Sequence, residues 1–187
     1  MHSFYERTSH STSVFKGQLI QVEVAQVELP NGEKSTREIV KHPGAVAIIP
    51  FTADGRLVVV RQFRKPLEKE IFEIPAGKLE QGEDPLETAR RELREETGYQ
   101  GEHFKLVTSF YTSPGFADEL IYIYEATQLK PGHGEQDEDE FVEPHLITLE
   151  EGLSLLANQK IHDAKTAFAI IYWQNKRLQE RLKNDSL

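Results

Sequence analysis

The sequence contains no cysteine, and this absence excludes several kinds of site. Without a thiol there is no disulfide framework, no thiolate metal site and no cysteine nucleophile. No apolar run approaches the roughly 20 residues that a membrane-spanning helix needs. The opening segment, MHSFYERTSH, lacks the apolar core of a signal peptide. We therefore expect a soluble, cytoplasmic protein that does not act at a membrane.

Positive charge is scarce as well. The 22 Lys and Arg residues face 31 Asp and Glu residues, which gives a formal net charge of -9. Such a balance argues against a nucleic-acid surface as partner. A net-acidic protein that binds a phosphate substrate must gather its cations locally, as arginines or as metal ions. The 187 residues suffice for one domain with a sizeable core and a small appendage.

The second half of residues 77–99, GKLEQGEDPLETARRELREETGY, predicts one amphipathic helix with clear ends. Asp84 is a good N-cap, and Pro85 suits the first helical position. Gly98 supplies the C-terminal stop, because glycine readily adopts the left-handed conformation found there.

Three glutamates fall in the last two turns of this helix. Glu92 and Glu96 are four residues apart and share a face, with Glu95 beside them. Mutual repulsion and the negative end of the helix dipole make this arrangement unfavourable by a few tenths of a kcal/mol per interaction. A hard divalent cation turns that cost into a binding site, since Mg²⁺ prefers carboxylate oxygens. The alternative is a solvated acidic face relieved by the arginines of the same helix.

The spacing favours the metal site. Gly77, five residues, Glu83, seven residues and then REL-x-EE-x-G resembles the signature of the Nudix hydrolases. Only Tyr99 departs from it, at a position that is usually a plain aliphatic. The resemblance implies a loop-helix-loop that binds Mg²⁺ or Mn²⁺ and hydrolyses nucleoside diphosphates linked to another moiety.

A second resemblance narrows the family. Pro114 lies sixteen residues beyond Gly98, within SPGFADE, as in the ADP-ribose pyrophosphatase branch. The segments REIVKHPGAV and QFRKP resemble that branch too. The implied reaction is hydrolysis of ADP-ribose to AMP and ribose 5-phosphate. Two alternatives remain: a preference for another sugar nucleotide or a dinucleoside polyphosphate, or a nucleotide-sensing module without turnover.

The resemblance also assigns the metal site. Two or three Mg²⁺ or Mn²⁺ ions would be held by the acids of the signature and one backbone carbonyl, namely Ala76 (carbonyl), Glu83, Glu92, Glu95 and Glu96. Arg91 would pair with these glutamates and fix their orientation.

Substrate contacts are expected from residues outside the helix. By resemblance, Arg37 is a candidate ligand contact. Arg64 could bind pyrophosphate oxygens, which suit the planar guanidinium. For both, a solvated arginine is the alternative. By resemblance, Phe116 beside Pro114 would shape the pocket and Glu119 would contact a ribose. Alternatively, Phe116 is an aromatic residue of the core and Glu119 is a loop acid without a role in binding.

The attacking water needs a base. Residues 130–140 carry two glycines, a proline and an acidic run, which predicts a mobile loop. By resemblance, a glutamate of this loop takes the proton of the water, with Glu138 as first candidate and Glu140 as second. The acidic run could instead serve solubility alone.

The expected fold is an α/β/α sandwich of the Nudix type. Its mixed sheet would comprise strands over 44–51, 57–63, 71–75, 104–111, 120–126 and 141–148. The helix over 84–98 would cover one face, and helices over 149–157 and 164–182 the other. Residues 43–187 would form this Nudix hydrolase domain.

Residues 1–42 predict a small antiparallel β subdomain. Strands over 17–24 and 36–41 flank the turn Leu29-Pro30-Asn31-Gly32. So small a sheet is marginal alone and should pack on something else. By resemblance, the subdomain is exchanged in a homodimer and completes the adenine side of the partner's site.

Overall fold

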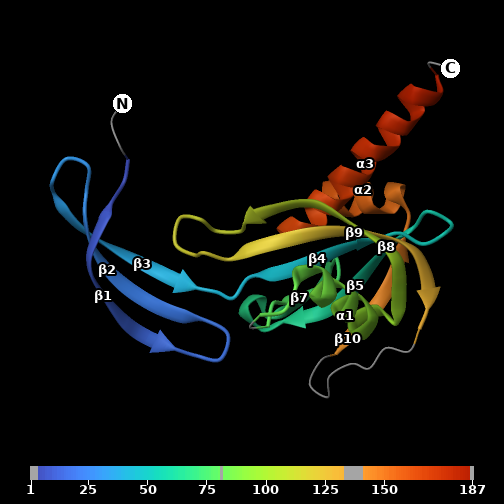
Figure 1. Cartoon of the computed structure of the whole chain (residues 1–187). Helices are drawn as coiled ribbons and strands as arrows, with labels where there is room; N and C mark the ends of the chain where they lie inside the picture. Colours follow the sequence, from blue (N-terminus) through green and yellow to red (C-terminus); the bar gives the residue numbers. More distant parts are fainter. Residues whose placement is uncertain (1–3, 81, 133–140, 186–187) are drawn as a thin grey trace.

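A computed structural model describes residues 4–80, 82–132 and 141–185, and the strands within these ranges form three sheets. The N-terminal sheet is an antiparallel meander of β1 (Arg7–Lys16), β2 (Gln21–Glu28) and β3 (Lys34–Lys41). Figure 1 shows this sheet standing apart from the rest of the chain. The N-terminal strands thus form an antiparallel sheet of their own.

The body of the molecule holds the other two sheets, of order β10-β5-β6 and β7-β4-β9-β8. Their strands are β4 (Ala45–Pro50), β5 (Leu57–Arg64), β6 (Lys69–Glu73), β7 (Ala76–Lys78), β8 (Tyr99–Tyr111), β9 (Leu120–Pro131) and β10 (Val142–Ile147), with a 3-10 turn at Lys65–Leu67. Strands β4 and β9 are parallel, whereas β7 and β8 pair antiparallel with their neighbours. The mixed sheet is confirmed, but the strands predicted over 57–63, 71–75 and 141–148 form a separate antiparallel sheet.

In the described ranges, three α-helices cover the body: α1 (Pro85–Thr97), α2 (Leu149–Ala157) and α3 (Ala164–Asn184). Figure 1 shows α1 on one side of the sheets and α2 with α3 on the other. Strand β4 is buried on both faces, as its apolar run predicts. Val46 and Ile48 pack toward α1, and Ala47 and Ile49 toward α2 and α3. The α/β/α sandwich is confirmed.

Both predicted ends of α1 are confirmed. The side chain of Asp84 accepts a hydrogen bond of 2.8 Å from the backbone N–H of Leu86. Gly98 has φ 71° and donates its N–H to the carbonyl of Arg94 at 2.9 Å. Because both caps are fixed, the register of the intervening acids on the helix surface is fixed too.

Several strand boundaries differ from the prediction. Residues 17–20 form the turn between β1 and β2, closed by the N–H of Gly17 bonding to the carbonyl of Ile20 at 2.9 Å. The strand expected over 17–24 therefore begins at Gln21. Strand β1 is exposed along its whole length, so no alternation of apolar residues marks it in the sequence. Strand β7 is too short to give a periodic signal.

The N-terminal sheet joins the body through the end of β3. The N–H of Val40 donates to the carbonyl of Phe116 at 2.7 Å, and the carbonyl of Val40 accepts from the N–H of Asp118 at 3.2 Å. Lys41 adds an ion pair of 2.9 Å to Asp118. This junction aligns β3 with the loop over 112–119.

None of the helices in the described ranges has the length and apolar character required to span a membrane.

Candidate active site

A cavity of about 420 Å³ lies beside the C-terminal half of α1. Its wall combines both signs of charge. The acids that line it are Glu80, Glu92, Glu95, Glu96 and Glu119. The cations that line it are Arg64, Lys78, Arg91 and Lys165. A cavity of this kind suits a ligand that carries phosphate and is accompanied by cations.

Arg91 gathers the predicted acids into one cluster. Its Nη1 donates to Glu92 Oε1 and to Glu95 Oε2, each at 2.8 Å. Its Nε and Nη2 donate to the two carboxylate oxygens of Glu83 at 3.2 and 3.3 Å. This hydrogen bonding lowers the pKa of Glu83 and so favours its ionised form. One guanidinium therefore holds three carboxylates that would otherwise repel each other.

The segment before α1 closes the cluster from the other side. The backbone N–H of Ala76 donates to Glu96 Oε2 at 3.0 Å. At Gly77, a Cβ atom would lie 1.9 Å from Oε1 of Glu92, so only glycine leaves room for that carboxylate. Strand β7 thus brings the Ala76 and Gly77 backbone against two buried glutamates of α1.

Arg64 lies at the same cavity, bonded to a buried acid. Its Nε and Nη2 donate to Glu73 Oε1 and Oε2 at 2.5 and 3.0 Å. The hydrogen bond to Glu73 raises the pKa of Arg64, with a smaller contribution from the charge of Glu96. Lys165, from the first turn of α3, donates to Glu73 Oε2 at 3.1 Å. Sequence reasoning missed Glu73 and Lys165; a lone acid inside the apolar strand IFEIP was the available signal.

Glu119 is held at the rim by two neighbours. Its Oε2 accepts from the hydroxyl of Thr112 at 2.5 Å, and its Oε1 lies 3.7 Å from Nε2 of His42. The Nδ1 of His42 accepts the N–H of Gly44 at 3.1 Å, so in the neutral ring Nε2 carries the proton. His42 also lines the cavity, and no metal-ligand spacing marks it in the sequence.

Three predicted contacts lie elsewhere. Arg37 does not line the cavity among the described residues; its guanidinium bonds to both carboxylate oxygens of Glu6, at 2.6 and 2.9 Å. Pro114 and Phe116 sit in the loop that joins β3, and they too are absent from the described lining. The two proposed bases, Glu138 and Glu140, fall outside the described residues.

The NUDIX domain family matches residues 41–169, which include the whole cluster on α1. The chain belongs to the NUDIX family. It is 53% identical over 178 residues to a protein of Bacillus subtilis (strain 168) named ADP-ribose pyrophosphatase, covering 94% of this chain and 96% of that relative. It is 52% identical over 183 residues to the methanol dehydrogenase activator of Bacillus methanolicus, covering 97% of each. The predicted family resemblance is confirmed.

A solved structure titled "Crystal structure of ADP compounds hydrolase" has the same fold. The two chains superpose with a TM-score of 0.81 at 23% identity, covering 94% of this chain and 95% of the other. At that identity, the structural similarity is evidence for the fold alone.

The acids around Arg91, namely Glu83, Glu92, Glu95 and Glu96, have the donor chemistry of a site for a hard cation. Their side-chain donor atoms are carboxylate oxygens, and Gly77 leaves the space that Glu92 fills. In the part of the chain that the structure describes, no group of three His, Cys, Asp or Glu side chains already has the arrangement of a metal site. Arg91 occupies the space between the acids instead. By their chemistry, the carboxylates fit a hard divalent cation.

Proposed function

We propose that this NUDIX protein hydrolyses the pyrophosphate of ADP-ribose to AMP and ribose 5-phosphate. One observation carries the proposal: a single cavity is lined by the cations Arg64 and Lys165 and by the α1 carboxylates Glu92, Glu95 and Glu96. Such a cavity can hold a diphosphate between bound cations and fixed ones. The relative named ADP-ribose pyrophosphatase, at 53% identity over nearly the whole length of both chains, supports this substrate over other nucleotides.

The proposed cofactor is Mg²⁺ or Mn²⁺, two or three ions per site. They would be held by the side chains of Glu83, Glu92, Glu95 and Glu96 and by the carbonyl of Ala76. When bound, such ions neutralise the diphosphate and lower the pKa of a coordinated water. Arg91 keeps the carboxylates oriented, since it already bonds three of them.

The remaining chemistry falls to side chains outside the α1 cluster. Arg64 binds a phosphate oxygen of the substrate and is held rigid by its two hydrogen bonds to Glu73. Glu119, on the rim, accepts hydrogen bonds from the hydroxyls of the terminal ribose. Glu138 takes a proton from the attacking water as general base, with Glu140 as the second candidate. Comparing Glu138→Gln with Glu140→Gln decides between them, because only the loss of the base removes turnover while substrate still binds.

We further propose that the chain works as a cytoplasmic homodimer. Residues 1–42 would form the exchanged subdomain, and residues 43–187 the hydrolase domain. Arg37, Pro114 and Phe116 would then serve the adenine side of a site shared between two subunits. Exposed apolar side chains at the end of β1 and in the turn after it, namely Val14, Phe15 and Leu19, support burial of this region against a second subunit.

Subunit mixing tests this exchange directly. If Arg37 acts in the partner's site, a heterodimer of Arg37→Ala and Glu96→Gln subunits contains one intact site. Mixing two inactive homodimers would then restore activity. No recovery after verified subunit exchange, or a monomer in sedimentation, contradicts the shared site.

The central experiment is a substrate panel with and without Mg²⁺. ADP-ribose, another sugar nucleotide and a dinucleoside polyphosphate are compared by kcat/KM for the wild-type protein and for Glu96→Gln. Loss of one such electrostatic contact costs about 3 kcal/mol, so turnover should fall at least about 100-fold. Glu87→Gln is the matched control, since Glu87 lies exposed on the same helix, 3.5 Å from Arg90. Equal rates across the panel would remove ADP-ribose as the preferred substrate, and binding without product release would indicate a sensing module.

A second candidate is activation of a methanol dehydrogenase. It is favoured by the relative of that name, which matches this chain at 52% identity over 97% of both lengths. Adding the protein to a methanol dehydrogenase and measuring alcohol oxidation tests it. Glu96→Gln shows whether any activation requires the same cavity.

A further inference from the structure

Lys165 joins the cavity from a distant part of the chain. It sits in the first turn of α3, whereas Arg64 ends β5, yet both line the same cavity. Both also bond Oε2 of Glu73, Arg64 at 3.0 Å and Lys165 at 3.1 Å. One buried carboxylate therefore sets two cations side by side.

The arrangement of charge in this group is directional. Glu73 and Asp163 have side chains that are 2% and 11% exposed, and neither lines the cavity. Arg64 and Lys165 are 40% and 15% exposed and do line it. Although the four charges balance, the acids lie behind and the cations face the ligand space. An anion in the cavity therefore meets the positive side of the group.

Lys165 is held in a charged state with a fixed position. Burial alone would lower the pKa of Lys165, but the charges of Asp163 and Glu73 outweigh it and raise that pKa. The ammonium donates to Asp163 Oδ1 at 2.6 Å and to Glu73 Oε2 at 3.1 Å. Within the described ranges, these bonds use two of its three N–H donors. The third is available to an anion in the cavity.

Asp163 anchors this lysine to the framework of the fold. It is the N-cap of α3, and its Oδ2 accepts from the N–H and hydroxyl of Thr166 at 2.9 and 2.6 Å. The same hydroxyl accepts the N–H of Ile74 at 2.8 Å, next to Glu73 on the chain. The start of α3 and the end of β6 are thus locked together, and the lysine has little freedom to move away.

We propose that Lys165 is a second cationic contact for the diphosphate of the substrate, positioned together with Arg64 by Glu73. This inference rests on the proposed function. A compact ammonium beside a planar guanidinium gives the diphosphate one point contact and one forked contact. Lys165 is then a binding residue contributed by the C-terminal helix rather than by the loop-helix-loop of the family signature.

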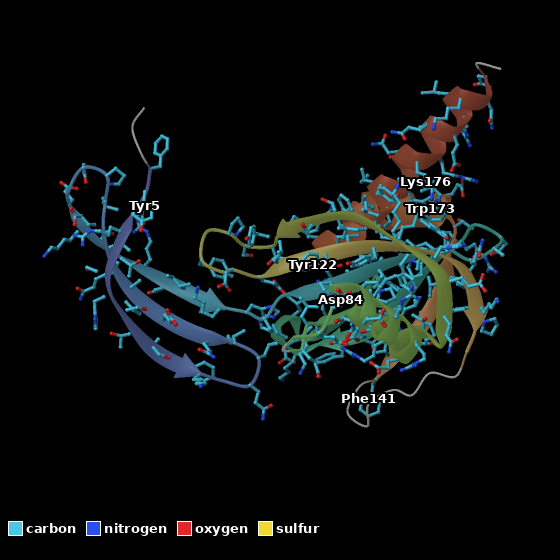
Figure 2. The ribbon with its side chains drawn as sticks, in the orientation of Figure 1. Tyr5, Asp84, Tyr122, Phe141, Trp173 and Lys176 are labelled. Carbon is cyan, nitrogen blue, oxygen red and sulfur yellow. The ribbon has the colours of Figure 1, made fainter. Side chains whose placement is uncertain are left out.

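The test compares Lys165→Met with Lys165→Arg and with Lys176→Met. Lys176 is the matched control, because it lies on the same helix and pairs with a mostly buried acid, Glu125, at 2.7 Å, but does not line the cavity. Figure 2 shows Lys176 further along α3, near Trp173. Binding of ADP and of adenosine is measured by calorimetry, alongside KM and kcat for ADP-ribose. Adenosine lacks the phosphates, so it reports any general distortion of the site.

Lys165→Met should weaken ADP binding about 10- to 100-fold, the value of one hydrogen bond to a charged group, and leave adenosine within about twofold. Lys165→Arg should recover most of the loss, and Lys176→Met should change neither ligand. Unchanged ADP binding in Lys165→Met, or equal losses for ADP and adenosine, overturns the proposal.

A measurement on the wild-type protein covers the case in which Lys165→Met does not fold. The ¹⁵N signal of the Lys165 ammonium, assigned through Lys165→Arg, should shift on adding ADP and stay in place on adding adenosine. A signal indifferent to ADP overturns the contact. ADP-ribose turnover by the wild-type protein is scored separately. Turnover with no effect at Lys165 removes this inference alone, whereas ADP binding without turnover removes the proposed function and keeps the contact.

Discussion

The carboxylate of Glu92 lies in the space that any side chain at Gly77 would need, since a Cβ there would come within 1.9 Å of Oε1. The backbone of Gly77 thus packs directly against the carboxylate of Glu92. Gly77→Ala should displace the end of Glu92 while leaving the core intact. Because a displacement of about 1 Å can cost about 100-fold in rate, we expect a loss in kcat/KM of that order with a small change in Tm.

Gly152→Ala is the control for this substitution, since a Cβ at position 152 meets its nearest atoms at 3.4 Å, an ordinary contact. Enzyme assays and thermal melts are run on both variants. Wild-type activity in Gly77→Ala would show that the position of the Glu92 carboxylate does not matter to the reaction.

Arg91→Lys should impair both stability and activity. A single ammonium cannot bond Glu83, Glu92 and Glu95 at once, as the guanidinium does. We expect a loss of about 1–3 kcal/mol in the free energy of unfolding, measured by urea denaturation in EDTA. Added Mg²⁺ should recover part of it by binding the folded state. Arg94→Lys, on the exposed side of α1, should behave as wild type; equal stability of the two variants in EDTA contradicts this role.

Glu119→Gln should act on the ribose end of the substrate. If Glu119 contacts the terminal ribose, the variant raises KM for ADP-ribose about 10-fold, the loss of one charged hydrogen bond. Inhibition by ADP, which lacks that ribose, should remain unchanged. A parallel loss for both ligands would place the effect in the loop held by Thr112 rather than in the contact.

Asp163 gives a prediction for pH. Burial raises its pKa, but Lys165 and Thr166 outweigh burial and lower the pKa below the ordinary value of 3.8. As pH falls below about 4, the unfolded state takes up the proton first, so the stabilisation present above that pH is lost on descending through the folded pKa. Asp163→Asn keeps a good N-cap and removes the charge. The variant should be less stable at pH 7 by about 1–3 kcal/mol and its stability should fall less steeply between pH 5 and pH 3 in urea titrations.

The local structure of helix α1 and its caps was predictable because it depends on interactions between residues close in sequence. An N-cap at Asp84, Pro85 in the first turn and Gly98 at the end fix a helix whichever domain surrounds it. Strand β4 was predictable because a short continuous apolar run is typical of a strand that is buried on both faces. The bounds of strand β1 were not predicted, because a strand exposed on both faces shows no alternation of apolar and polar residues.

The amino-acid sequence by itself determined the helix and its acids, the α/β/α layering and the membership of the NUDIX family. Only the tertiary structure decided that Glu73 and Lys165 meet Arg64, that His42 reaches Glu119, and that Arg37 lies outside the cavity of its own chain. The physical reason is distance along the chain. Capping and periodicity act within a few residues, whereas Glu73 and Lys165 are 92 positions apart and come together only when α3 packs against β6.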